Sequence, residues 1–402
     1  MRTTRPFSYP AVDFLMTLLG LGLFVLDVVL DLVLLASLCR IGEFYLLTVL
    51  AVLLLVSSVL VQVFSWLWYR YDTDRPRTSA EAWVERAGLL GLCHVLQLAV
   101  FLRYAALVET ALRSFGDRRT DLDLEGVSVY LTHDLNMLRL FETFFESAPQ
   151  LLLMVLIIIR QQEAGLLTVA KAVGSAASIS WTVLMYHRSL RSFLVDKTQQ
   201  SYASSALYFL WNLLLIAPRV AALALLGSAL PCLVPAHFLC LWLPLFLWAW
   251  LQRTDFMDSV GGEWLYRGAV ALVWYFSWFS VAEGEPGRSL IYHAFMAADG
   301  ALLLAVWWTL RDDEPAVFLA AIPLSYILGL LLKALYYRHA HPSLARLQAP
   351  PPDATARLIA HENDEVDSLP QPPVSDRCIE APPPPTVQPN KRMRRLATNF
   401  YS

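Results

Sequence analysis

The stretch HDLNMLRLFETFFESAPQLLLMVLIIIR, residues 133–160, decides the fold class of this chain. A helix needs roughly 20 predominantly apolar residues to cross the hydrocarbon core of a bilayer, and this stretch is long enough. Polar side chains nevertheless recur in it at spacings of three, four and four residues, at Arg139, Glu142, Glu146 and Gln150. Side chains at these spacings share one helical face. The stretch therefore predicts a membrane helix with a polar face, on which Glu146 lies roughly 18 Å from Asp134, near mid-membrane.

Long apolar runs extend to both sides of this stretch. Of the 402 residues, 57% are hydrophobic and only 16% are charged, whereas soluble domains carry about a quarter charged residues. Ten segments approach the length of a crossing: about 12–39, 44–69, 87–110, 134–159, 165–186, 203–229, 234–251, 264–282, 289–310 and 316–337. The run that begins at residue 11 is too long for a signal-peptide core and lacks a clear cleavage site. It predicts a retained first transmembrane helix with a cytosolic N-terminus.

The distribution of basic residues conflicts with ten simple crossings. Arginine and lysine cluster at 70–86, 113–119 and 188–197, and the positive-inside rule places such clusters in the cytosol. The conflict disappears if the segments at about 87–110 and about 264–282 enter from the cytosol and return without crossing. The sequence therefore predicts an all-α polytopic membrane protein with eight transmembrane helices and two re-entrant hairpins.

The same order of elements, two crossings, a hairpin and two crossings, then occurs twice. This order predicts two parallel structural repeats, at residues 1–195 and 200–340, as in many transporters. Residues 341–402 form a third part. Within it, residues 349–390 are rich in proline and acidic residues and lack apolar periodicity, which is typical of disorder. We expect a disordered, cytosolic regulatory tail.

Ionisable side chains inside a membrane are costly, face protein or water, and are candidates for function. The predicted lipid path is a ladder of such side chains: Asp13, Asp27, Asp31, Arg103, Asp134, Arg139, Glu142, Glu146, Gln150 and Arg219. Pro149 is expected to kink its helix beside Glu146 and to free a carbonyl. A ladder of this kind suits a phospholipid whose headgroup moves past charged partners while its acyl chains stay in the hydrocarbon.

Other interpretations of the same charges stay open. Internal pairing, of Glu142 or Glu146 with Arg219 or Arg103, would simply lock helices together. A proton relay, an ion pathway or an amino-acid transporter would use the charges as a coupling site. A structural subunit that stabilises another membrane protein is a further alternative.

Several chemical signatures are missing from the sequence. It has no GxxxxGK[ST] phosphate loop, no HExxH motif and no CxxC pair, which argues against ATP-driven pumping, zinc hydrolysis and thiol redox chemistry. The carboxylates of Asp27, Asp31, Glu142 and Glu146 resemble a Ca²⁺ site, but the nearby arginines argue against one. We expect a passive path rather than an enzyme, with no cofactor, no metal and no nucleic-acid partner.

The tail contains a match to the cleavage site of an executioner caspase: Asp364, Glu365, Val366, Asp367 and Ser368. Such a caspase requires Asp before the cut and prefers Asp three residues earlier, a small residue after it, and an extended, accessible strand. The match predicts cleavage after Asp367, although a chance acidic tetrapeptide remains the alternative.

A basic run follows the predicted cut: Lys391, Arg392, Arg394 and Arg395. It is expected to bind anionic lipid, or to fold back and hold the cytosolic face closed until the tail is cut. An ordinary solvated terminus is the alternative.

Several stretches resemble one family of membrane proteins. The stretches MLRLFETFFESAPQ (137–150), ALYFLWNLLLIAPRV (206–220), EWLYR (263–267) and WYFSWFSVAEG (274–284) closely resemble the XK-related family. The likeness extends over about residues 10–340. It implies ATP-independent movement of phospholipids between leaflets, with phosphatidylserine exposed at the plasma membrane of dying cells after caspase cleavage. It also implies a single-span immunoglobulin-type partner, basigin or neuroplastin.

The resemblance also extends to individual charged positions. Those that match the family pattern are Asp13, Asp27, Asp31, Asp134, Arg139, Glu142, Glu146 and Arg219. One departure precedes Arg188: the family usually has an acidic residue where this chain has Met185, which questions a buried ion pair for Arg188.

Overall fold

The computed structural model describes residues 9–72, 77–116, 122–161, 165–194, 200–281, 286–310 and 317–340, with Arg392, Arg395 and Leu396 from the tail. All regular structure in these ranges is helical. The helices are α1 (Ala11–Ile41), α2 (Phe44–Tyr71), α3 (Ser79–Arg86), α4 (Leu90–Val95), α5 (Ala99–Gly116), α6 (Leu122–Phe145), α7 (Ser147–Gln161), α8 (Leu166–Phe193), α9 (Tyr202–Ala229), α10 (Leu233–Leu251), α11 (Val260–Phe276), α12 (Pro286–Leu310) and α13 (Val317–Leu335), which continues as a π-helical turn, Tyr336–Ala340.

Eight helical stretches in the described ranges are long and apolar enough to cross a membrane. They are Ala11–Ile41, Phe44–Tyr71, Leu124–Arg160, Leu166–Phe193, Tyr202–Ala229, Leu233–Leu251, Gly287–Leu310 and Val317–Ala340. This confirms the all-helical fold with eight candidate spans. The two re-entrant hairpins, the parallel repeats and the disordered tail stay predictions.

The segments predicted as hairpins are not among the eight. The segment at about 87–110 divides into α4 and α5 around Gln97, whose φ of 63° lies in the left-handed region that side chains rarely adopt. The segment at about 264–282 divides into α11 and an extended continuation that begins at Ser277. In each of these two segments the helix is therefore interrupted, whereas a simple membrane span would be one continuous helix.

The helix that contains residues 133–160 differs from its predicted bounds. It starts at Leu122 rather than near 134, because residues 127–131 pack in the core although the preceding residues alternate acidic and apolar side chains. A turn at Glu146 separates α6 from α7. Pro149 has no N–H to donate to the Phe145 carbonyl, which accounts for the interruption at this point.

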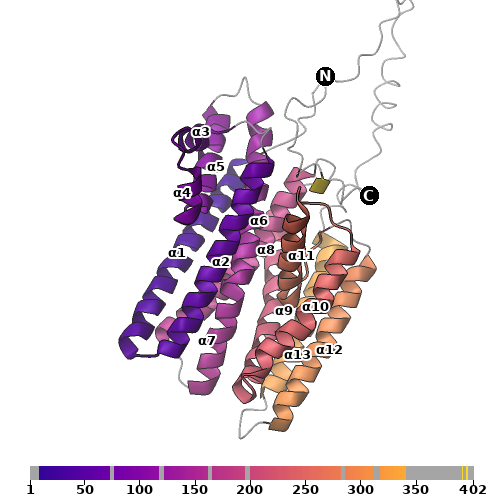
Figure 1. Cartoon of the computed structure of the whole chain (residues 1–402). Coiled ribbons are helices and arrows are strands. Elements are labelled where there is room, and N and C mark those ends of the chain that lie inside the picture. Colours follow the sequence, from indigo (N-terminus) through magenta and orange to yellow (C-terminus); the bar gives the residue numbers. More distant parts are fainter. Residues whose placement is uncertain are drawn as a thin grey trace, which may run out of the picture.

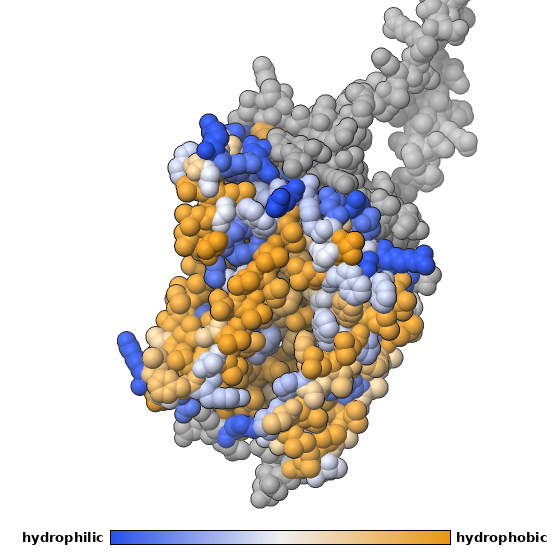
Figure 2. Space-filling view, viewed as in Figure 1, coloured by the Kyte–Doolittle hydropathy of each residue, from blue (hydrophilic) through white to orange (hydrophobic). Residues whose placement is uncertain are grey.

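The helices form one elongated bundle (Figure 1). Helices α6, α8 and α9 each contribute more buried side chains than any other described helix, and α1 and α2 lie on one side of them. The short helices α3 and α4 lie at the end opposite to the α1–α2 connection. Apolar side chains cover most of the visible outer surface of the bundle (Figure 2). Leu32, Leu55 and Leu331 are examples that are each about 60% exposed, an arrangement stable in lipid rather than in water.

Candidate functional site

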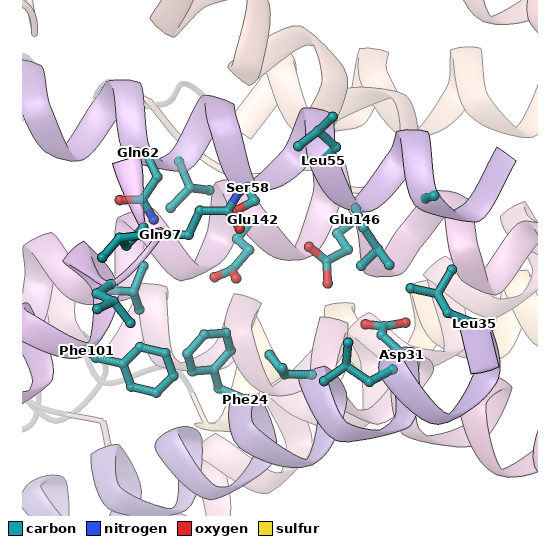
Figure 3. A pocket seen from close by; sticks show the side chains of 18 residues that line it. Phe24, Asp31, Leu35, Leu55, Ser58, Gln62, Gln97, Phe101, Glu142 and Glu146 are labelled. Atoms are coloured by element: carbon teal, nitrogen blue, oxygen red, sulfur yellow. The ribbon is translucent and has the colours of Figure 1, made fainter. Parts of the chain in front are cut away.

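A cavity of about 450 Å³ lies between α1, α2, the α4–α5 break and the α6–α7 junction (Figure 3). Its polar side chains are Asp31, Ser58, Gln62, Gln97, Glu142 and Glu146. Its apolar lining includes Leu32 and Leu55, which are exposed on the lipid-facing surface of α1 and α2. Because charged groups lie inside and exposed apolar groups form the rim, the cavity fits an amphipathic molecule with a polar head and apolar chains.

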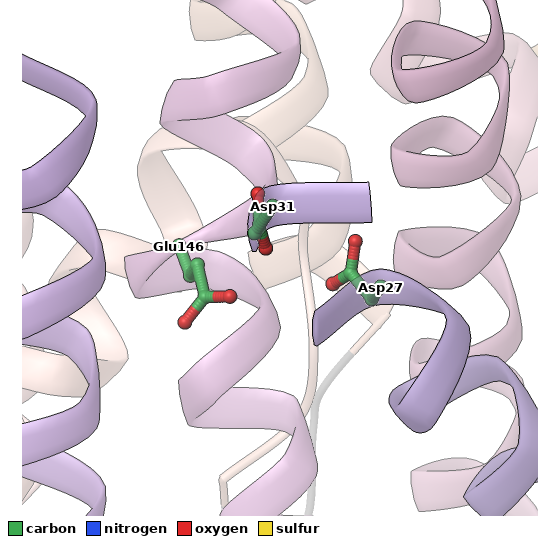
Figure 4. Close-up of side chains that lie close together, drawn as sticks. All are labelled: Asp27, Asp31 and Glu146. Carbon is green, nitrogen blue, oxygen red and sulfur yellow. The ribbon is translucent and has the colours of Figure 1, made fainter. Parts of the chain in front are cut away.

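One end of the cavity contains a cluster of three carboxyl groups. Oxygen atoms of Asp27, Asp31 and Glu146 lie within 4.8 Å of one another (Figure 4). The fully buried Lys171 reaches them from α8, with its Nζ 2.5 Å from Asp27 and 2.9 Å from Asp31. Ser147 also donates a hydrogen bond of 3.0 Å to Asp27. The lysine therefore ties α8 to α1 and supplies a positive charge within the carboxylate cluster.

Charges around the cavity do not balance within the described part of the chain. Arg139 forms an ion pair with Glu142 one turn further along α6, and its guanidinium carbon lies 4.1 Å from the Phe24 ring centre. Lys171 pairs with Asp27 and Asp31, and Glu146 forms no ion pair with any described residue. Four carboxyl groups thus share two cations. Because an unpaired buried charge is costly, the site favours a proton or an additional cation.

All ten residues of the predicted path are buried. They do not form one continuous row but belong to several separate groups of contacting residues. Arg188 donates to Asp13 at 2.5 Å, despite Met185, and joins α8 to α1. Arg103 lies 3.5 Å from Asp134. Arg103 and Asp134 thus pair with each other, and neither lines the cavity.

Arg219 belongs to another part of the bundle. It pairs with Asp299, which also lies 3.0 Å from His237. Gln150 is fully buried, and neither its amide oxygen nor its nitrogen has a hydrogen-bond partner in the described part of the structure. Arginine and carboxylate therefore do pair internally, but with partners other than those considered from the sequence.

Three further charged residues complete these contacts: Lys171, Arg188 and Asp299. Lys171 receives no role from the sequence, an ion pair for Arg188 is questioned, and Asp299 is not placed on the predicted path. Lys171 and Asp299 lie within predicted apolar segments, so the rule that selected the other charged residues also selects these two, whereas Arg188 lies two residues beyond such a segment. Their partners could not be read from the sequence, because they lie on helices far apart in the chain.

At the end of the bundle near α3, the tail residue Arg392 lies in a closed site that we call the socket: Trp68, Asp72, Asp134 and Phe256. The arginine donates to Asp72 at 2.8 Å and to both carboxylate oxygens of Asp134 at 2.7 Å. Its guanidinium carbon lies 4.2 Å from the Trp68 ring centre and 5.1 Å from that of Phe256. Only 1% of Arg392 is exposed, so this contact is a buried one.

Two further tail residues contact the same end of the molecule. Arg395 lies 2.8 Å from Asp258 and donates to the Met257 carbonyl at 3.1 Å, and Leu396 is fully buried in the core. The predicted cleavage residues 364–368, together with Lys391 and Arg394, lie outside the described residues. Burial raises the pKa of the Asp72 carboxyl above its ordinary value, and the positive charge of Arg392 opposes this rise.

Eight apolar spans with buried charges define a polytopic α-helical membrane protein. Residues 15–342 match the family model described as XK-related protein. The chain is 45% identical over 408 residues to XK-related protein 8 of Tetraodon nigroviridis and 44% identical over 407 residues to that of Gasterosteus aculeatus, with 98% of both chains covered in each comparison. It is 37% identical to XK-related protein 8 of Pan troglodytes over 97% of this chain and 94% of the relative. The chain belongs to the XK-related family.

Proposed function

We propose that this chain is an ATP-independent phospholipid scramblase of the plasma membrane that is activated by caspase cleavage and exposes phosphatidylserine on apoptotic cells. The observation that carries the proposal is the cavity with charged groups inside and an exposed apolar rim. The family membership and the similarity to proteins named XK-related protein 8 support it.

A path for lipids must lower the free-energy cost that a charged headgroup incurs when it leaves water for the hydrocarbon. A charged headgroup alone in the bilayer loses its hydration, at a cost of several kcal/mol or more. Glu146 and Asp31 line the cavity and offer negative charge to the ammonium group of a lipid. Behind this lining, Arg139 pairs with Glu142 and Lys171 pairs with Asp31. The acyl chains would remain in contact with the rim. No energy source is needed for movement in both directions.

The tail contacts provide a mechanism for control. Arg392 and Leu396 are buried in the body of the protein, and both follow the predicted cut after Asp367 in the chain. Cleavage would leave them attached only by non-covalent contacts and allow them to dissociate. The partners that we propose for this chain are membrane phospholipids, an executioner caspase and a single-span protein similar to basigin or neuroplastin.

Replacement of the residue before the cut tests the switch. In cells that contain active executioner caspase, Asp367→Ala should reduce caspase-triggered phosphatidylserine exposure to background, because the required acid is missing. Ser368→Ala is the matched control, since it keeps a small residue after the cut and should preserve exposure. Annexin binding and a blot for the shortened chain measure the outcome. Normal exposure by an uncut Asp367→Ala chain would reject caspase control.

A second substitution tests the role of the cavity. Contacts with charged groups contribute about 1.5–3 kcal/mol, so Glu146→Gln should slow lipid movement by roughly 10- to 150-fold without preventing folding. The assay is movement of a labelled lipid in liposomes that contain the cleaved protein. Glu85→Gln, a surface change on α3, is the control and should move lipid at the original rate.

The same liposomes separate the proposal from its alternatives. Lipid movement without flux of amino acids or ions supports scrambling. Solute flux without lipid movement would indicate a transporter that uses these charges for coupling. Neither activity from a cleaved, folded protein with its single-span partner would indicate a structural subunit.

A further inference from the structure

The socket that contains Arg392 has the chemistry of a site for organic cations. Its two aromatic rings stand at 90° to one another with centres 5.9 Å apart, so they form two walls of a corner. The carboxylates of Asp72 and Asp134 contact the cation from other sides. Trp68 and Phe256 are both fully buried. Aromatic faces combined with carboxylates are how proteins recognise quaternary ammonium groups such as choline.

We propose that, once the tail has left, the socket receives the ammonium group of an inner-leaflet phospholipid, choline or ethanolamine, and is the cytosolic entry site of the lipid path. This inference rests on the proposed function. In the uncleaved chain Arg392 occupies the socket. In the cleaved chain a lipid headgroup takes its place.

The charges of the socket favour a replacement cation. The ion pair with Arg392 is the only one that Asp72 forms with described residues. Its Oδ1 atom is already buried without a hydrogen-bond partner in that part of the structure. Arg103 lies 3.5 Å from Asp134 and remains when the tail leaves. An ammonium group would then replace the charge that Arg392 contributed to Asp72 and Asp134, without loss of the aromatic contacts.

The socket and the cavity are built partly on the same two helices. Helix α2 supplies Trp68 to the socket and Gln62 to the cavity, and helix α6 supplies Asp134 and Glu142 in the same way. At 1.5 Å per residue these pairs are separated by about 9 and 12 Å along the helices, roughly the length of one headgroup. The socket and the cavity are therefore neighbouring sites along the same two helices.

The first test compares lipids with and without an ammonium group. In liposomes, the cleaved protein should move labelled phosphatidylcholine and phosphatidylethanolamine faster than phosphatidylglycerol. Trp68→Leu should lower the ratio of phosphatidylcholine to phosphatidylglycerol rates by about tenfold, since a desolvated cation–π contact is worth about 1–2 kcal/mol. Trp68→Phe keeps a weaker ring and should give an intermediate ratio. Trp83→Leu, at an exposed tryptophan of α3, is the matched control and should leave the ratio unchanged.

The second test measures binding and does not depend on transport. In a maltoside detergent, saturation-transfer NMR should detect the trimethylammonium protons of dihexanoyl phosphatidylcholine on the cleaved protein with its single-span partner. The signal should be weak for the uncleaved protein, where Arg392 fills the socket, weak for cleaved Trp68→Leu and intermediate for cleaved Trp68→Phe. It should persist in cleaved Trp83→Leu. Free choline at equal concentration should give little signal, and an equal signal from choline would assign the site to a soluble cation instead.

The two tests distinguish the claim that the protein scrambles lipid from the claim that the socket binds the ammonium group of a lipid. A cleaved protein that binds the choline lipid but moves no lipid would reject scrambling and preserve the cation site. A cleaved protein that moves all lipids equally, with the same rates in Trp68→Phe, would preserve scrambling and reject the socket as an entry site.

Discussion

A chain with Arg392→Ala should move lipid without any cleavage. The substitution removes one partner of a buried ion pair and leaves Asp72 and Asp134 to face the empty place, which costs about 3–5 kcal/mol. A change of this size shifts the balance between attached and detached tail by about two to three orders of magnitude. Phosphatidylserine should therefore appear on cells whose caspases are inhibited, and annexin binding measures it.

The neighbouring arginine is the matched control. The side chain of Arg395 is 26% exposed and pairs with Asp255 and Asp258 at the surface, and exposed pairs contribute about 0–1 kcal/mol. Arg395→Ala should therefore raise uncleaved activity much less than Arg392→Ala. An Arg392→Ala chain that reaches the cell surface and stays silent until it is cut would show that the buried contact does not control the path.

Hydropathy marked ten apolar segments of roughly spanning length, and the distribution of basic residues reduced them to eight crossings, the number of long apolar helices in the described ranges. Hydropathy failed where polar residues continue a helix beyond the apolar run. The acidic and apolar residues that precede Tyr130 gave no span signal, yet α6 continues through them because this part packs in the protein interior. The hairpin predicted at about 87–110 implied an interruption of the helix, but its position at Gln97 was not visible, since a left-handed residue other than glycine has no clear sequence signature.

For the candidate site, the sequence predicted which residues were costly but not how they pair. Asp13 and Arg188 are 175 residues apart, and Asp72 and Arg392 are 320 apart. Such pairs depend on which helices become neighbours, and the spacing of charges along one helix carries no information about that. Composition predicted disorder for residues 349–390 and a basic run after them that binds lipid or folds back, but it did not indicate that Arg392 would be among the most buried residues of the described structure.

Replacement of the buried Lys171 should have the largest effect on folding. Lys171→Met would leave Asp27 and Asp31 without the ammonium group that contacts both, at a cost of about 3–5 kcal/mol. Total stabilities are typically about 5–15 kcal/mol, so most of the protein should fail to reach the cell surface. Surface labelling and the melting temperature in detergent measure the loss.

A second intramembrane lysine shows whether the effect comes from the carboxylates or from loss of any buried amine. Lys333 is also buried, but its Nζ contacts the neutral groups of Ser289 at 2.7 Å and His293 at 2.6 Å. Lys333→Met strands no carboxylate and should cost less. Adding Asp27→Asn to Lys171→Met removes one of the stranded charges and should recover part of the surface protein. Equal losses from both lysine changes, with no recovery in the double variant, would mean that the carboxylates do not need Lys171.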